Sequence, residues 1–234
     1  GTIWTQEAKL VSSDSESGAK FGYSVSMSGD GSRVIVGALY HSNGKGKAYI
    51  FSRSGTTWTE ETILVAVDRS NNDQFGKSVS ISSDGSRVAV GAPFTEVGST
   101  GYDQGVVHIF SRSGTTWTEE TILSASDKES SALFGSSCAI SSDGSHLIVG
   151  ADFDDVNDLT NSGAAYVFSR LNTTWTEEDK LIPSTSEIGG AFGSSCSISN
   201  DGSQVIVGAP KNTGTGGVNS GVAYVFTRRG TTWI

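Results

Sequence analysis

One pattern of apolar and polar positions occurs four times along the chain. In the second copy it runs through four short segments: FGKSVSIS from Phe75, RVAVGAP from Arg87, GVVHIFSR from Gly105 and WTEETIL from Trp117. The first segment alternates between larger and very small side chains, which predicts a strand with one crowded face. The second and third segments are continuous apolar runs, which are typical of strands covered on both faces. Each copy is therefore predicted to form a four-stranded antiparallel sheet.

Two kinds of connection join these segments. The first and second strands are joined in every copy by an Asp-Gly pair, which supplies the positive φ angles of a tight hairpin. The pairs are Asp30-Gly31, Asp84-Gly85, Asp143-Gly144 and Asp201-Gly202. The connection from the second strand to the third is longer and varies, from residues 38–46 in the first copy to residues 92–105 in the second. Variable loops on a constant frame are where a binding surface is expected.

The apolar middle strands need cover on both sides, and neighbouring sheets of the same kind can supply it. Radial packing of sheets around an axis meets this need, with the strand of small residues innermost. The sequence therefore predicts an all-β fold, a β-propeller of four-stranded antiparallel blades, as a single domain over residues 1–234. The repeats, each beginning at a Trp, cover about 4–57, 58–116, 117–174 and 175–232.

Two dipeptide motifs at fixed spacing connect the chain with a known family. A Phe-Gly pair opens the first strand of every copy, and Gly-Ala, twice followed by Pro, closes the second strand. The Phe-Gly pairs are Phe21-Gly22, Phe75-Gly76, Phe134-Gly135 and Phe192-Gly193, and the later motifs are Val36-Gly37-Ala38, Val90-Gly91-Ala92-Pro93, Val149-Gly150-Ala151 and Val207-Gly208-Ala209-Pro210. In these motifs the chain resembles the FG-GAP repeats of integrin α-subunit propellers.

The resemblance implies a first strand near the axis, a ligand-binding face formed by the two-to-three and four-to-one loops, and a ring of about seven blades. Many integrin-type blades also hold calcium in an Asp-rich loop between strands one and two. Here that loop is a bare Asp-Gly turn, which argues against calcium at that position.

The number of blades in the complete ring is left open by the sequence. Residues 1–10 match a fourth strand without its first three, and residues 229–234 begin another fourth strand. If the segment around Trp4 completes the last blade, the ring closes with four blades. Alternatively, the four repeats are part of a larger ring of seven or eight blades, either because two chains form a homo-oligomeric ring of eight or because the four repeats neighbour further repeats of a longer chain.

The resemblance and the variable loops favour a non-enzymatic binding or adhesion module, extracellular or at the cell surface, with an extracellular protein or glycan as its partner. Aromatic residues in such loops can stack against sugar rings or fill a partner's pocket. The predicted ligand-binding residues are Tyr40, Phe94, Tyr102, Phe153 and Asp154. The alternatives are a structural or assembly component of a larger propeller, fibre or surface coat, and a carbohydrate-binding lectin.

One acidic loop is the candidate metal site. Hard cations such as calcium prefer carboxylate and amide oxygens. The loop after the second strand of the third copy supplies four carboxylates, those of Asp152, Asp154, Asp155 and Asp158. It lacks the ordered spacing of a known calcium loop, so a solvated acidic loop is the alternative. A separate modification site is the sequon at Asn172, which is predicted to lie in an exposed turn and to carry a glycan in a secretory pathway.

Three other features recur in register and are expected to be structural. Asp14, Asp68 and Asp127 open the four-to-one loops and suit an Asx-turn or bonds to backbone amides. Cys138 and Cys196 stand where other copies have valine, and they are predicted to remain free thiols. The repeated Trp is expected to pack between blades, with the Glu pairs that follow it forming a solvated rim.

Charge and motif content exclude several functions. The net charge is −9 and no Lys/Arg run occurs, so nucleic-acid binding is not expected. No stretch approaches the roughly 20 apolar residues of a membrane helix, so membrane insertion is not expected either. An enzyme is not predicted, since His41, His108 and His146 fall at unrelated repeat positions and no nucleophile or phosphate-binding motif is present.

Overall fold

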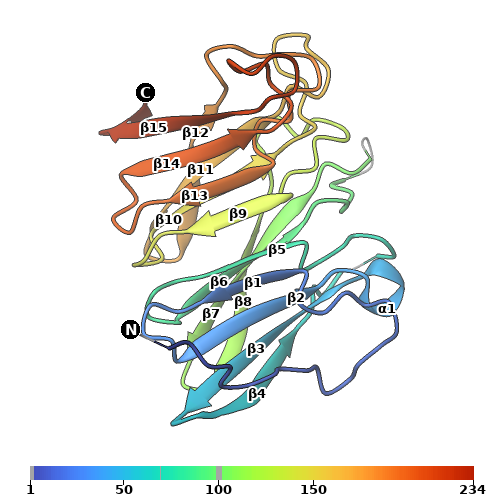
Figure 1. The fold of residues 1–234 in the computed structure, drawn as a ribbon, viewed down its shortest axis with the longest axis vertical. Helices are drawn as coiled ribbons and strands as arrows, with labels where there is room; N and C mark the ends of the chain where they lie inside the picture. Colours follow the sequence, from blue (N-terminus) through green and yellow to red (C-terminus); the bar gives the residue numbers. More distant parts are fainter. Residues whose placement is uncertain (1–2, 69, 99–101) are drawn as a thin grey trace.

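The computed structural model describes residues 3–68, 70–98 and 102–234, and within them it forms four antiparallel sheets of four strands each (Figure 1). In every sheet the strands pair in chain order, so each is a simple meander. A short helical turn, α1 (His41–Gly44), lies in the first two-to-three loop. The predicted all-β class and the propeller-blade meander are therefore confirmed.

The sheets are numbered as blades 1 to 4 along the chain. Blade 1 contains β1 (Ser24–Met27), β2 (Arg33–Ala38), β3 (Lys47–Ser54) and β4 (Thr57–Leu64). Blade 2 contains β5 (Ser78–Ile81), β6 (Arg87–Ala92), β7 (Val106–Ser113) and β8 (Thr116–Leu123). Blade 3 contains β9 (Ser137–Ile140), β10 (His146–Ala151), β11 (Ala164–Leu171) and β12 (Thr174–Leu181). Blade 4 contains β13 (Ser195–Ile198), β14 (Gln204–Ala209), β15 (Val222–Arg229) and β16 (Thr232–Trp233).

The blades do not coincide with the Trp-marked repeats. Each fourth strand includes the Trp that opens the next repeat, as Trp58 does in β4 and Trp117 in β8. Every sheet therefore takes three strands from one repeat and the fourth from its successor.

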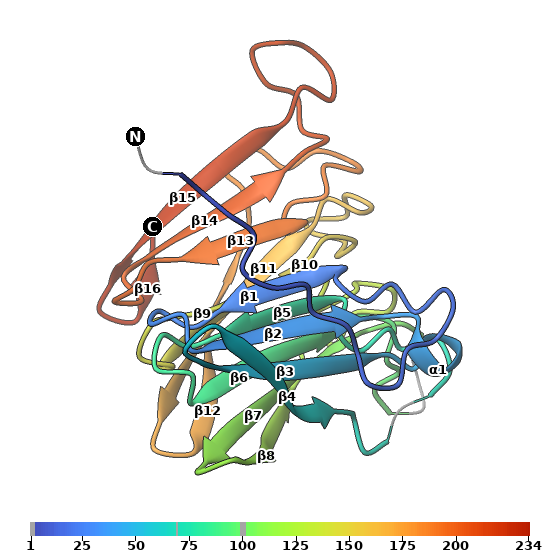
Figure 2. The ribbon, with the colours of Figure 1, turned by 60° about the horizontal axis from the view of Figure 1, so that its bottom comes forward.

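The inner strands bring neighbouring blades into close contact. Contacts run in series from β1 to β5, from β5 to β9 and from β9 to β13, and these inner strands can be followed in Figure 2. Residues of all four strands line a cavity of about 440 Å³. At the first junction the Ser24 hydroxyl donates to the Gly76 carbonyl over 2.8 Å. A Cβ on Gly37 would lie 2.1 Å from that same carbonyl oxygen, so a side chain there would force the blades apart. The small residues predicted to mark a crowded face thus lie where two sheets nearly touch.

Three apolar clusters fill the spaces between blades. Between blades 2 and 3, for example, Val107 and Ile109 pack against Phe134. Phe134 is fully buried, with its ring edge-on to Tyr166 at 5.4 Å and to Phe168 at 5.9 Å between centroids. The middle strands of the inner blades are therefore covered on both sides, as the apolar runs predicted.

The two end blades differ in how their outward faces are covered, because Leu10 of the N-terminal segment packs against Val34 and Val36 of blade 1. The leading face of blade 1 exposes Val25 by 67% and Met27 by 57%. The trailing face of blade 4 exposes Ile206 by 45% and Val225 by 62%. In the described part of the chain, the inner strand of blade 1 and the middle strands of blade 4 therefore keep apolar side chains accessible.

A glutamate latch joins the outer strands of neighbouring blades. The second Glu after Trp58, Trp117 and Trp175, predicted to lie in a solvated rim, instead reaches into the next blade. Glu120 of β8 accepts hydrogen bonds from Arg170 Nε at 2.7 Å and Trp175 Nε1 at 3.0 Å, both in blade 3, and its side chain is only 7% exposed. Glu178 binds Arg228 and Trp233 of blade 4 in the same way. The rim interpretation is corrected because these charge-assisted bonds outweigh the cost of burying a carboxylate.

The two cysteines are free, as predicted, and they lie between blades. Burial raises the pKa of Cys138 to about 11 and that of Cys196 to about 12, which keeps both in the unreactive thiol form.

We predict that Phe134→Ala lowers the free energy of unfolding by about 3–5 kcal/mol, because it opens a cavity between two sheets. Denaturant unfolding followed by tryptophan fluorescence measures the loss. Phe153→Ala is the matched control, since this ring is 39% exposed and its removal is expected to cost little. A loss below about 1 kcal/mol for Phe134→Ala would contradict its place in the inter-blade core.

The glutamate latch predicts that the free energy of unfolding decreases in acid. Burial opposes ionisation of Glu120, but the hydrogen bond and charge of Arg170, with Trp175 and Arg87, outweigh it and hold its pKa below the ordinary value. Because the pKa is lower in the folded state, this stabilisation is full above the usual glutamate pKa of about 4.3 and is lost as pH falls through the folded pKa.

We expect Glu120→Gln to lose about 1.5–3 kcal/mol at neutral pH, with the difference from wild type shrinking in acid. Urea unfolding between neutral and acidic pH measures this, with the exposed Asp158→Asn as control. A difference that stays constant with pH would exclude the charged latch.

Candidate functional site

The long connections gather at one end of the blades, which we call the loop face. Each second strand there is followed, two residues on, by a residue whose backbone N–H donates to a carbonyl of the preceding four-to-one loop. The donor and acceptor pairs are Tyr40 to Ala19, Phe94 to Asp73, Phe153 to Ala132 and Lys211 to Gly190. Because the same bond recurs in every blade, these four residues occupy equivalent places, and we call Tyr40, Phe94, Phe153 and Lys211 the loop-face row.

The loop-face row presents aromatic surface to solvent. Tyr40 is 44% and Phe153 39% exposed, whereas Phe94 is half-buried. Lys211 Nζ lies 5.9 Å from the centre of the Phe153 ring, so neighbouring members of the row reach one another across a blade junction. A second cation–aromatic pair, Lys77 over Tyr23 at 4.9 Å, lies at the start of the first strands of blades 1 and 2. Exposed rings interleaved with lysines form a platform for flat or anionic groups.

An acidic pocket of about 430 Å³ adjoins this row in blade 2. Its lining includes Phe94 with the carboxylates of Asp68, Asp73, Glu96 and Asp103. Burial, and the nearby charges of Asp68 and Glu96, raise the pKa of Asp73 despite the hydrogen bond that it accepts from the Ser70 N–H. The pocket therefore favours ligands with hydroxyl or cationic donors.

Tyr102, the remaining aromatic candidate, is 72% exposed on the same two-to-three loop. Its N–H donates to Ser130 Oγ at 3.1 Å, and its carbonyl accepts from the Ser131 N–H at 2.7 Å. The loop of blade 2 is thus tied to the four-to-one loop of blade 3. The structure brings Phe94 into the acidic pocket and leaves the Tyr102 ring free.

Asp154 does not belong to the exposed surface, and its assignment as a ligand-binding residue is corrected. Its side chain is completely buried, with Oδ2 accepting from Tyr166 Oη at 2.6 Å and Oδ1 from Lys180 Nζ at 2.9 Å. Tyr166 also donates to Asp127 at 2.9 Å. Burial and the two carboxylates raise the pKa of the Tyr166 hydroxyl, so it remains a donor. The network fastens the two-to-three loop to the four-to-one loop of blade 3.

The four carboxylates predicted to hold a metal are not gathered into one cluster. Asp155 and Asp158 are exposed, Asp152 is half-buried, and Asp154 is already bonded to a lysine. Asp155 accepts the Asn161 N–H at 2.6 Å within its own loop. Over the residues that the structure describes, no group of three or more His, Cys, Asp or Glu side chains is placed to hold a metal ion. The physical reason is that Lys180 neutralises Asp154, the one carboxylate buried enough to form the centre of a site.

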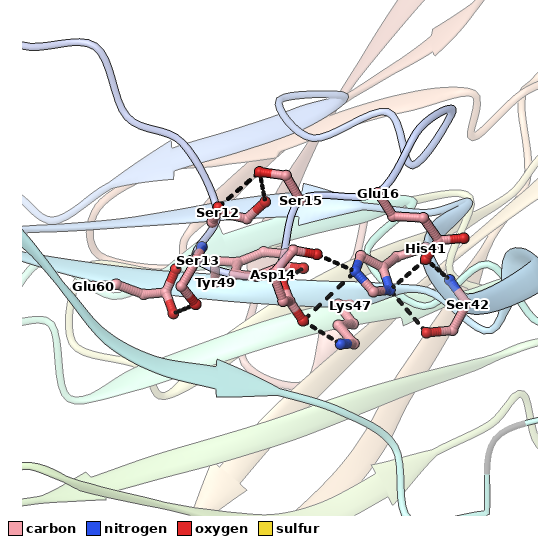
Figure 3. Close-up of polar contacts among 10 residues, drawn as sticks. All are labelled: Ser12, Ser13, Asp14, Ser15, Glu16, His41, Ser42, Lys47, Tyr49 and Glu60. Carbon is pink, nitrogen blue, oxygen red and sulfur yellow. Dashed lines mark hydrogen bonds and ion pairs between the residues drawn. The ribbon is translucent and has the colours of Figure 1, made fainter.

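Blade 1 has an equivalent network with different side chains (Figure 3). Asp14 accepts a hydrogen bond from Tyr49 Oη at 2.7 Å and pairs with Lys47. Burial opposes ionisation of Asp14, but the bonds from Lys47 and Tyr49 outweigh it and lower its pKa. His41, in α1, lies against the Asp14 carbonyl at 3.0 Å and against the Glu16 carboxylate at 3.1 Å. These contacts hold the N-terminal segment on the two-to-three loop.

Blades 2 and 4 have different polar contacts at the position of this network. His108 replaces the tyrosine in blade 2 and contacts Glu119 at 2.5 Å. In blade 4, Tyr224 lies 2.9 Å from Thr185 Oγ1 and accepts from Asn212 Nδ2 at 3.0 Å. Asp14 and Asp127 thus have a structural role, in which each accepts a tyrosine hydroxyl. Asp68, the third recurring aspartate, lines the acidic pocket of blade 2. The tyrosine in the third strand of three copies was the sequence signal for this network.

Asn172 lies, as predicted, in an exposed turn, between β11 and β12. Its φ of 58° is a left-handed conformation that asparagine tolerates well. The side chain is accessible for modification at the end of the blades away from the loop face.

Comparison with known proteins agrees with this architecture. No curated protein sequence matches the chain. Among solved structures, the chain is similar to hydrazine synthase of Kuenenia stuttgartiensis, with a TM-score of 0.51 and 14% identity over 85% of this chain and 45% of that chain. At this identity the likeness extends to the fold alone. None of the described helices is long and apolar enough to cross a membrane.

The family model described as the FG-GAP repeat matches residues 4–51, 58–110, 117–168 and 175–226. These matches begin at the four tryptophans that open the repeats and end within the third strands. The protein belongs to the FG-GAP repeat family.

Proposed function

We propose that the protein is a non-enzymatic, extracellular binding module that holds a glycan or protein ligand on its loop face. The observation that carries this proposal is the loop-face row, in which three successive blades present an aromatic side chain at the same backbone position. Tyr40 and Phe153 keep about two-fifths of their surface accessible, at 44% and 39%. Exposed aromatic anchors on a rigid frame are favourable binding elements.

The neighbouring polar groups favour a ligand rich in hydroxyl groups. The acidic pocket beside Phe94 offers four carboxylates, those of Asp68, Asp73, Glu96 and Asp103, as acceptors. An aromatic ring next to carboxylate acceptors suits a sugar, which stacks through its C–H face and donates through its hydroxyls. A glycan therefore fits this part of the face better than an apolar small molecule.

The placement of the histidines supports a function without catalysis. His41 and His108 are buried and bonded within blades 1 and 2. His146 lies in blade 3, at the start of β10 and at the end away from the loop face. The three histidines belong to three different blades and do not form one cluster with other potential ligands among the described residues.

An extracellular location is supported by the exposed sequon at Asn172, and the formal net charge of −9 is compatible with it. A second function, assembly with further blades, is favoured by a separate observation, the exposed apolar side chains of Val25 and Met27 in blade 1 and of Ile206 and Val225 in blade 4.

We predict that Tyr40→Ala and Phe153→Ala each weaken ligand binding about tenfold while leaving the melting temperature within about 2 °C. Binding is measured by screening the wild-type chain against a glycan array and an array of extracellular proteins, followed by titration of each hit. Leu171→Glu serves as the control, since Leu171 is 78% exposed at the opposite end of the blades.

Glycan hits sensitive to both aromatic substitutions would identify a lectin, and protein hits an adhesion module. Hits that bind both variants as tightly as wild type would contradict the use of the loop face. An absence of hits in both arrays would count against the binding proposal as a whole.

A further inference from the structure

In blades 1 to 3, the side chain at the start of the second strand packs against the Asp-Gly hairpin of the next blade. These side chains are Arg33, Arg87 and His146. A Cβ on the glycine of the facing hairpin would lie 3.2, 3.3 and 2.6 Å, respectively, from them. At the junction of blades 3 and 4, the histidine therefore occupies the place that an arginine has at the other two junctions.

The two arginines also bind the latch glutamate of their own blade. Arg33 Nε and Arg87 Nε each donate to that carboxylate, over 3.1 and 3.3 Å. In blade 3 the latch glutamate, Glu178, accepts hydrogen bonds from Arg228 and Trp233 of blade 4. No hydrogen bond joins it to His146 in the described part of the chain. This junction thus lacks an ion pair that the other two have.

The hydrogen bonds around His146 identify its neutral tautomer. Ser145 Oγ lies 2.8 Å from His146 Nδ1, and the Ser145 hydroxyl donates to Asp143 at 2.7 Å. Because a hydroxyl has only one hydrogen, Nδ1 carries the imidazole proton and donates to Ser145 Oγ. Nε2 then has a free lone pair, and it is buried without a hydrogen-bond partner among the described residues.

A second proton on the imidazole would create a buried, charged N–H at Nε2 with no acceptor in place. Four charged groups surround the ring, namely Arg228 from β15, Glu178 from β12, and Asp143 and Asp201 from the hairpins of blades 3 and 4. The three carboxylates favour the imidazolium. Burial and the charge of Arg228 outweigh them, so the pKa of His146 lies below its ordinary value.

We propose that the junction of blades 3 and 4 is an acid-sensitive joint, which stays closed while His146 is neutral and loosens when Nε2 is protonated. In a loosened junction Nε2–H can donate to water, so the proton is bound more readily there. Because the pKa is lower in the closed state, the junction is fully stable above the ordinary histidine pKa of about 6.5 and weakens as pH falls through the closed-state pKa. The arginines at the other junctions stay charged throughout.

The loop-face row crosses the same junction, since Phe153 belongs to blade 3 and Lys211 to blade 4. Loosening in acid is therefore expected to separate these two side chains. The joint does not require the ligand proposed for the loop face, so it is tested on the chain alone.

Two thiols report on two junctions separately. Cys196 Sγ lies 3.2 Å from Ser137 Oγ, at the junction of blades 3 and 4. Cys138 Sγ lies 3.3 Å from Ser78 Oγ, at the junction of blades 2 and 3, which contains Arg87 and serves as the matched control. Cys138→Val leaves Cys196 as the one thiol, and Cys196→Val leaves Cys138. Valine already occupies this position in the first two copies.

Labelling with a dipyridyl disulfide, which reacts with thiols even in mild acid, measures the opening of each junction at about pH 7.5 and about pH 5. Each rate is divided by that of glutathione under the same conditions, which removes the pH dependence of the reagent. The relative rate at Cys196 is expected to rise about tenfold in acid, and that at Cys138 to stay constant. Glu120 and Glu178 remain ionised over this range, because their pKa values lie below the ordinary value of about 4.3.

Two substitutions remove the titrating group. His146→Gln introduces the residue that the fourth copy has at this position, and His146→Arg introduces that of the first two copies. In both variants the labelling of Cys196 is expected not to accelerate in acid. Equal acceleration at Cys196 and Cys138 would mean that the whole array loosens, and acceleration that persists in both variants would assign the effect to another group. Either result, or a constant rate at Cys196 in the chain that keeps His146, would overturn the proposal.

Discussion

The fold depends on how closely neighbouring sheets approach at their inner strands. At each internal junction a second-strand glycine faces the carbonyl of the next blade's Phe-Gly pair, and a Cβ on Gly37, Gly91 or Gly150 would lie 2.1, 2.1 or 1.9 Å from that oxygen. The serine hydroxyl beside it satisfies the same carbonyl, so the contact is tight without leaving a buried acceptor unpaired. The large apolar residues can then meet farther out, where the sheets diverge. Phe75, Phe134 and Phe192 fill that wedge, each completely buried.

This rigid frame determines what the loop face can do. The two-to-three loops of blades 1, 3 and 4 are held twice, by the backbone bond of the loop-face row and by a polar network at the base of the loops. The networks differ in composition, with His41 in blade 1 and Asp154 in blade 3 at equivalent positions. Since the anchoring is internal, exposed side chains such as Tyr102 are free to vary without disturbing the blade. Binding specificity and stability are thereby assigned to different residues of the same loop.

The sequence predicted the frame well because its signals are repeated four times. Three signals each have one physical explanation. They are the apolar runs of strands covered on both faces, the Asp-Gly pairs of the hairpins and the small residues at the close contacts between blades, and the structure contains all three. The loop chemistry was harder to predict because it depends on which side chains meet across segments distant in sequence. From the sequence alone Asp154 is predicted to be an exposed acidic residue. Its contacts with Tyr166 and Lys180 are evident only in the structure. From the sequence alone Glu120 is likewise predicted to be a surface residue. Its hydrogen bond with Arg170, fifty positions away, appears only in the structure.

The offset between repeats and sheets has an evolutionary consequence. Because each sheet borrows its last strand from the following repeat, adjacent sheets are interlocked by the covalent chain itself. Duplicating or deleting one whole repeat in the gene would change how many blades are made, yet every internal sheet would still hold a full set of strands. The number of repeats can therefore change during evolution without an intermediate in which an internal sheet lacks a strand.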